Sequence, residues 1–117
     1  MSTRKIQRLL EQALLHDGEM HLALYEYELA EQVDELRRSL AEDRDDYIFT
    51  VTENRGHVAM LLIEKSGEIY RNEAARERLK KLWPAAYEKN MKALIPAFAA
   101  KLAAGELPIN GVKTVAS

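Results

Sequence analysis

Apolar residues in the first third of the chain recur at helical spacing. Between residues 3 and 16 they form one stripe at i, i+3, i+4, i+7 and i+8: Ile6, Leu9, Leu10, Ala13 and Leu14. Asp17-Gly18 then interrupts the pattern, because glycine suits the left-handed position past a helix end and aspartate caps a following helix. From Glu19 to Asp43 a second stripe runs at spacings of three and four: Leu22, Tyr25, Leu29, Val33, Leu36 and Leu40. The sequence predicts that residues 1–43 are helical, as a helical hairpin or as one kinked helix.

The pattern changes at Tyr47, where β-branched and aromatic residues replace the helical stripe. The segment 47–71 is predicted to form three strands separated by two turns: Tyr47–Glu53, the turn Asn54-Arg55-Gly56, Val58–Ile63, the turn Lys65-Ser66-Gly67, and Glu68–Arg71. The middle strand is apolar on both faces, which is typical of a central strand that is covered on both sides. We therefore expect an antiparallel meander with helices on one face and with helices or another subunit on the other.

Helical spacing returns over residues 72–105. Asn72 is a good N-cap for a helix that ends at Trp83-Pro84, and Pro84 suits the first position of the next helix. The strongest apolar stripe of the chain follows and runs to Gly105: Tyr87, Met91, Leu94, Ile95, Phe98 and Leu102. Pro96 lies inside it and removes a backbone donor, so we expect either a kink near Met91–Ile95 or two short helices in line.

The last segment, 106–117, holds an Asn110-Gly111 pair between apolar residues, which indicates a small hairpin or a tail that docks on the rest of the protein. Together these patterns predict an α+β fold. The chain has 117 residues, which suits a single domain, and it contains no cysteine, which excludes disulfides, thiol nucleophiles and thiolate metal sites. No stretch resembles a signal peptide or a membrane span, so a cytoplasmic location is expected.

The charge is distributed unevenly along the chain. Residues 1–64 hold 7 Lys/Arg and 14 Asp/Glu, whereas residues 65–117 hold 10 and 5, so the two parts carry −7 and +5 within a net charge of −2. A basic half suits a nucleic acid or an acidic partner surface, and in a dimer it also suits the acidic half of a second copy. Two solvated helix surfaces that never meet explain the same pattern.

Residues that support catalysis or metal binding do not form a recognisable set. His16 and His21 are five residues apart, which separates them around a helix, and His57 has no carboxylate at ligand spacing. The acidic run 42–46 fails the calcium-loop pattern, because Tyr47 and Ile48 stand where an oxygen ligand and a glycine are needed. No glycine-flanked serine or phosphate-binding glycine loop occurs. We therefore expect no enzymatic activity, no metal and no cofactor.

One segment suggests a binding site. The predicted helix after strand three combines five cations with an aromatic side chain, a combination that grips phosphates and stacks bases: Arg71, Arg76, Arg78, Lys80, Lys81 and Trp83. Part of this charge has a simpler explanation, since Glu77 precedes Lys80 and Lys81 by three and four positions. An aromatic residue beside a proline at a helix junction is also a common core residue.

The sequence thus favours a small regulatory module that binds a protein partner and acts as a homodimer, because its apolar surface exceeds what three strands cover. The alternative is a nucleic-acid-binding regulator that uses the basic helix 71–83. No membrane association is expected.

Overall fold

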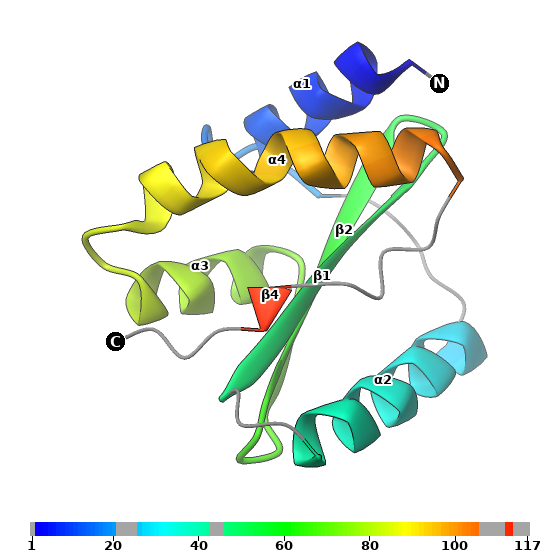
Figure 1. Cartoon of the computed structure of the whole chain (residues 1–117), viewed down its shortest axis with the longest axis vertical. Coiled ribbons are helices and arrows are strands. Elements are labelled where there is room, and N and C mark those ends of the chain that lie inside the picture. Colours follow the sequence, from blue (N-terminus) through cyan, green and yellow to red (C-terminus); the bar gives the residue numbers. More distant parts are fainter. Residues whose placement is uncertain (1, 21–25, 43–45, 106–111, 114–117) are drawn as a thin grey trace.

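The computed structural model describes residues 2–20, 26–42, 46–105 and 112–113. Helices and strands follow one another along these residues as α1 (Thr3–Leu14), α2 (Glu26–Ala41), β1 (Tyr47–Asn54), β2 (His57–Glu64), β3 (Ile69–Arg71), α3 (Glu73–Leu82), α4 (Tyr87–Ala103) and β4 (Val112–Lys113) (Figure 1). The predicted α+β fold, with helices before and after an antiparallel meander, is confirmed.

The sheet has the strand order β3-β2-β1-β4, and every described neighbour pair is antiparallel. β1 and β2 pair over eight residues each and are joined by the two-residue turn Arg55-Gly56. Both turn residues have positive φ, 51° and 86°, as a type I′ hairpin turn requires. β2 is the central strand of the meander, and six of its eight residues are buried, as the doubly apolar pattern predicts.

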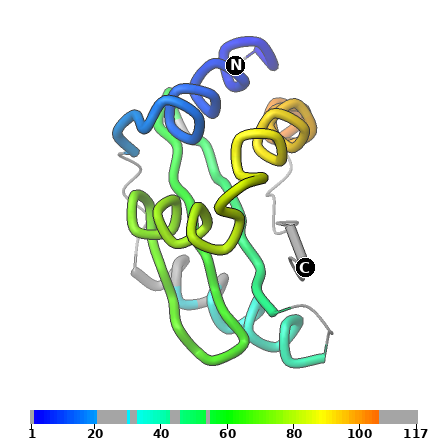
Figure 2. Tube along the Cα trace, turned by 90° about the vertical axis from the view of Figure 1, so that its left-hand side faces the viewer, coloured from blue at the N-terminus to red at the C-terminus, as the bar shows by residue number. Residues whose placement is uncertain are grey.

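The two faces of the sheet bury different clusters because side chains alternate along a strand. Phe49 of β1 and Leu62 of β2 point to the face that α1, α3 and α4 cover. Ile48 of β1 and Ile63 of β2 point to the opposite face, where α2 contributes Val33, Leu36 and Leu40. In Figure 2, α1 and α4 lie side by side, and α2 lies apart from both of them.

The N-terminal helices do not form the predicted hairpin or a single kinked helix, since α1 and α2 pack on opposite faces of the sheet. The predicted start of the second helix is also wrong, because Glu19 and Met20 are not helical; Leu22 and Tyr25 lie outside the described residues. The turn after α1 differs from the prediction in the roles of Asp17 and Gly18. Asp17 takes the left-handed conformation, with φ 54°, and Gly18 is needed because an added Cβ would lie 2.7 Å from the carbonyl oxygen of Gln12.

Asn72 occupies the predicted N-cap position of α3, but its side chain does not cap the helix. Its Oδ1 instead accepts a hydrogen bond from the Met60 backbone N–H, at 3.2 Å, and its own N–H donates to the Met60 carbonyl. Asn72 thereby continues the pairing along β2 where β3 has ended. This pairing fixes the start of α3 against the sheet.

The junction between α3 and α4 lies close to its predicted position. α3 ends at Leu82, but Pro84 belongs to a turn and α4 begins only at Tyr87, so the prediction that Pro84 starts the helix is wrong. α4 is one continuous helix that passes through Pro96. Of the two alternatives at Pro96, two short helices are therefore excluded.

Near the C-terminus, β4 pairs with the outer edge of β1, where Val112 lies opposite Phe49. This pairing places Val112 and Lys113, the two described residues of the segment, on the sheet. The Asn110-Gly111 pair, on which the hairpin alternative depends, lies outside the described residues. None of the helices in the described ranges is both long enough and apolar enough to cross a membrane.

Candidate ligand-binding groove

The six residues predicted to form a basic binding site do not share one surface. Arg76 and Trp83 are buried, with exposed fractions of 6% and 5%. Arg78 and Lys80 are half-buried and engaged in ion pairs, the former with Glu64. Only Arg71 and Lys81 of the six are exposed. The fold therefore uses most of this charge internally.

Arg76 holds the chain that follows α1. Its Nη1 donates to the carbonyl oxygens of Ala13, at 2.6 Å, and Gly18, at 2.7 Å. Its Nε lies 3.5 Å from a carboxylate oxygen of Asp17, but it forms no hydrogen bond and is buried. A buried guanidinium with carbonyl and carboxylate partners is a structural clamp rather than a free phosphate ligand.

Trp83 is a core residue, as one of the two interpretations of its position predicts. Its ring packs edge-on against Tyr47, with centroids 6.0 Å apart, and against Phe49, at 6.2 Å. Such edge-to-face contacts stabilise a core beyond the area they bury. The indole is thus not available to stack on a base in this conformation.

A groove with a volume of about 620 Å³ lies between α1 and α4. Three helices and the turn after α1 contribute its lining: Gln7, Glu11, Leu15, His16, Lys80, Tyr87, Glu88, Lys92, Ile95 and Pro96. This volume lies within the range of known ligand sites. We call this hollow the α1–α4 groove.

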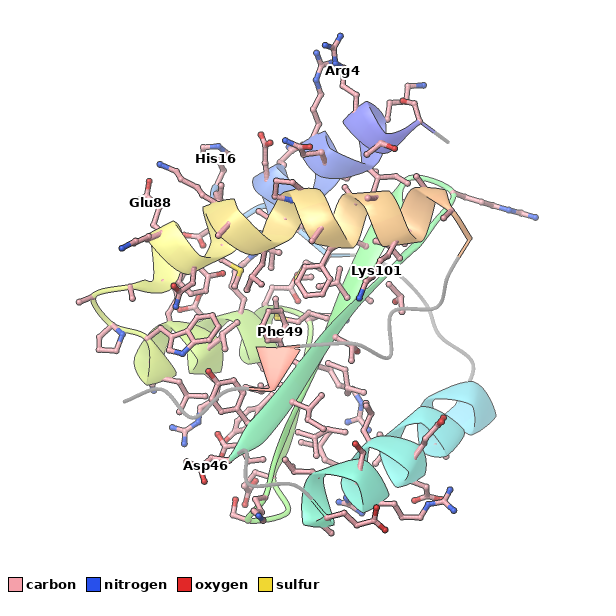
Figure 3. All side chains as sticks on the ribbon, in the orientation of Figure 1. Arg4, His16, Asp46, Phe49, Glu88 and Lys101 are labelled. Atoms are coloured by element: carbon pink, nitrogen blue, oxygen red, sulfur yellow. The ribbon has the colours of Figure 1, made fainter. Side chains whose placement is uncertain are left out.

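Polar side chains around the α1–α4 groove are held in pairs. Gln7 donates to Glu11 at 3.1 Å along α1, and Lys92 pairs with Glu88 at 2.8 Å along α4. These pairs connect residues four apart on one helix, the spacing at which helix side chains meet. His16 and Glu88 lie near each other at one end of the two helices (Figure 3).

Lys80 contacts both Tyr87, a residue of the groove lining, and Asp17, in the turn after α1. Its Nζ pairs with Asp17 and lies 5.6 Å from the centroid of the Tyr87 ring, within cation–π range. The hydroxyl of Tyr87 is directed inward, where it donates to the Leu14 carbonyl at 2.9 Å. Tyr87 is therefore a largely buried residue of the groove lining, and its hydroxyl stays in the core.

Three ionisable groups at this site have shifted pKa values. The hydrogen bond from Lys80 lowers the pKa of Asp17, with further lowering by Arg76 and His16. Lys92 lowers the pKa of Glu88 in the same way, and His16 adds to it. Burial raises the pKa of Tyr87. Tyr87 and Glu88 line the groove, and Asp17 is paired with the lining residue Lys80. Perturbed pKa values cluster at functional sites, and ion pairs of purely structural origin shift pKa values too.

The predictions on metal binding concern residues that the structure only partly describes. His16 lines the groove and His57 lies at the start of β2, beside a smaller hollow of about 340 Å³. His21 and the Asp43–Asp45 segment lie outside the described residues. Over the ranges that are described, no three His, Asp or Glu side chains are grouped as metal ligands would be.

Sequence patterns did not predict the α1–α4 groove. Each helix carries polar residues beside its apolar stripe, but helical spacing does not say that the two flanks meet across a hollow. Comparison with protein-family models, curated proteins and solved structures finds no match for this chain.

Proposed function

We propose that this protein is a non-catalytic binding module, that its ligand site is the α1–α4 groove, and that its ligand is part of another protein. The observation that carries the proposal is the groove itself, a hollow of about 620 Å³ whose lining combines apolar and ionisable side chains from three helices. Leu15, Ile95 and Pro96 supply apolar surface, and charged pairs flank it. Protein interfaces likewise combine apolar contacts with polar and charged side chains.

The aromatic side chains favour a protein ligand over a nucleic acid. Single-stranded nucleic acids bind through aromatic rings that stack on successive bases. The five aromatic residues of the larger core cluster are all buried: Tyr47, Phe49, Trp83, Tyr87 and Phe98. Tyr70 is half-buried, with the guanidinium of Arg78 5.7 Å from its ring centroid. No described aromatic ring is therefore well exposed for stacking.

Nucleic-acid binding through the basic helix 71–83 stays a prediction. Arg71 and Lys81 are the two exposed cations that would carry it, since Arg78 and Lys80 are ion-paired. Filter binding across a salt series tests this alternative. A phosphate-binding surface must lose affinity steeply as salt rises, and the Arg71→Glu/Lys81→Glu variant must weaken it.

The predicted homodimer is independent of the groove and also stays a prediction. The homodimer is predicted partly because the second apolar face of the sheet must be buried by a helix or by another subunit. In the structure, α2 of the same chain buries part of that face. Analytical ultracentrifugation over micromolar concentrations tests the homodimer. A single monomeric species at all concentrations would contradict the homodimer.

Site-specific photo-crosslinking tests the proposed groove. A photoreactive amino acid is placed at Gln7 or Lys92, which line the groove, and at the exposed Glu35 on α2 as a matched control. The experiment is done in the native host. We expect one discrete protein adduct from both groove positions and none from the control. The same adducts from all three positions, or an adduct from Glu35 alone, would contradict the proposal.

A further inference from the structure

The helices on the two faces of the sheet differ in charge. α1 and α4, which form the groove, together carry six Lys/Arg and two Asp/Glu, a formal charge of +4. α2, on the other face, carries two Arg and five Asp/Glu, a formal charge of −3. The fold therefore separates a basic helical surface from an acidic helix, and the groove lies in the basic one.

The acidic side chains at the groove already have partners. Glu11 accepts a hydrogen bond from Gln7, Glu88 pairs with Lys92, and Asp17 pairs with Lys80. Each of these carboxylates is thus engaged by a neighbour on the same protein. They do not provide a surplus of negative charge for a basic ligand.

Several cations beside the groove have no such partner. Arg4 and Arg8 share a face of α1 with the lining residues Glu11 and Leu15, because residues three, four and seven apart lie on the same side of a helix. Lys89 neighbours Glu88 and lies on the exposed side of α4. Arg4, Arg8 and Lys89 form no ion pair within the ranges that the structure describes, and all three are exposed. The two helices that form the groove therefore carry exposed, unpaired positive charge outside its lining.

We infer that the occupant of the α1–α4 groove is an acidic segment of a partner protein, whose apolar side chains enter the groove and whose carboxylates pair with Arg4, Arg8 and Lys89. This inference rests on the proposed function and specifies its ligand. Complementary charge beside the groove raises the rate of association and selects against basic partners, while apolar contact in the groove supplies affinity.

The probe for this inference is a displayed library of random 16-residue peptides, selected against the full-length protein. We expect enriched peptides that combine Asp and Glu with apolar residues. A synthetic copy of an enriched peptide should shift the amide resonances of α1 and α4 and leave those of α2 unchanged. Its affinity should fall as salt is raised from low to physiological concentration, because exposed ion pairs are screened.

Charge reversal tests the role of the free cations. Arg8→Glu/Lys89→Glu should weaken the selected peptide by about tenfold or more, since each change replaces attraction by repulsion. Lys101→Glu is the matched control, because Lys101 lies on α4 away from the groove lining and forms no ion pair with a described residue (Figure 3). It should change the affinity by less than about threefold. Circular dichroism confirms that both variants are folded.

The outcomes separate this inference from the proposed function. Two results would overturn the acidic occupant and still leave the groove as a protein-binding site. In the first, the peptides that map to the groove are neutral or basic. In the second, Arg8→Glu/Lys89→Glu binds an acidic peptide with unchanged affinity. Failure to enrich any peptide, or enriched peptides that map elsewhere, overturns both. A 30-nucleotide single-stranded DNA is used as a competitor beside unlabelled peptide. If the DNA displaces the bound peptide at a lower concentration than unlabelled peptide does, the inference is overturned in favour of a polyanion site. Self-association that the same double variant abolishes identifies the occupant as a second copy of this chain.

Discussion

The two faces of the sheet differ in what covers them and in how they are held. The face under α1, α3 and α4 holds a core cluster of 19 described residues with five aromatic rings, whereas the core cluster under α2 has six described residues, all aliphatic. Phe49 connects the rings of the larger cluster, since it packs edge-on against both Trp83 and Phe98. The larger face also contains the clamp formed by Arg76.

This difference bears on how firmly the helices of each face are held. A large, aromatic core fixes α1 and α4 relative to each other, so the groove between them has a defined shape, which would reduce the entropy lost on binding the proposed ligand. Among the described residues, the core cluster on the α2 face is smaller and contains no buried charge clamp. We expect α2 to open locally at a lower free energy than the rest of the protein.

The largest expected effect concerns the larger core. Phe49→Ala should reduce the free energy of unfolding by about 3–5 kcal/mol, and Leu36→Ala on the α2 face by about 2–3 kcal/mol, because the smaller cluster can close around the lost volume. Urea denaturation measures both. If Phe49→Ala does not fold, Phe49→Leu should still cost about 1 kcal/mol. Equal costs at Phe49 and Leu36 would contradict the difference between the two faces.

Arg76→Met removes the charged clamp and retains much of its apolar length. We expect a loss of about 3 kcal/mol, because the carbonyls of Ala13 and Gly18 lose charge-assisted hydrogen bonds in a buried site. Arg76→Lys should recover part of this loss, since it keeps the charge but not the planar fork. Thermal and urea unfolding measure both variants. A loss below about 1 kcal/mol for Arg76→Met would show that the clamp does not stabilise the fold.

Tyr87→Phe tests the inward hydroxyl below the groove. At pH 7 it should cost about 1 kcal/mol, because the Leu14 carbonyl loses its donor. Burial raises the pKa of Tyr87, so above pH 10 the unfolded chain loses the phenol proton while the folded protein keeps it. Stability from this group is complete below pH 10 and declines as the pH rises above it. Tyr87→Phe should therefore be less sensitive to alkaline pH than wild type, and equal sensitivity would contradict the assignment.

Asp17→Asn should have the smallest effect. Lys80 lowers the pKa of Asp17, so the carboxylate stabilises the folded protein above about pH 4, and this contribution is lost as the pH falls through the folded-state pKa. The side chain of Asp17 is 56% exposed, so we expect a cost of less than about 1 kcal/mol at pH 7. Asparagine tolerates the left-handed backbone of Asp17. The melting temperatures of wild type and variant should therefore converge as the pH falls below the folded-state pKa of Asp17, and a constant difference would contradict the pairing.

Local patterns predicted most of the secondary structure. The stripe on Val33, Leu36 and Leu40 correctly indicated a buried helix face, and the doubly apolar β2 correctly indicated a central strand. The same stripe did not predict which element α2 packs against, because an apolar helix face can pack equally well against another helix or against a sheet. The hairpin of helices was wrong for this reason.

The candidate site was less accessible to prediction. Spacing along α3 showed a row of cations and an aromatic residue, but it did not show that Arg76 and Trp83 turn inward while Arg78 and Lys80 find carboxylates 14 and 63 residues away in the chain. Charge partners so distant in sequence leave no local pattern. The α1–α4 groove is of the same kind, since its residues come from segments far apart in the chain.

The sequence by itself determined where helices and strands form, which side of each is apolar, and that the protein contains no cysteine chemistry. These properties depend on spacing and residue type within a few turns of chain. Only the tertiary structure decided that α1 joins α4 on one face, that α2 covers the other, and that a groove lies between the first two. Those outcomes depend on which apolar surfaces meet, and many pairings of amphipathic elements bury similar areas, so the geometry of the whole chain selects among them.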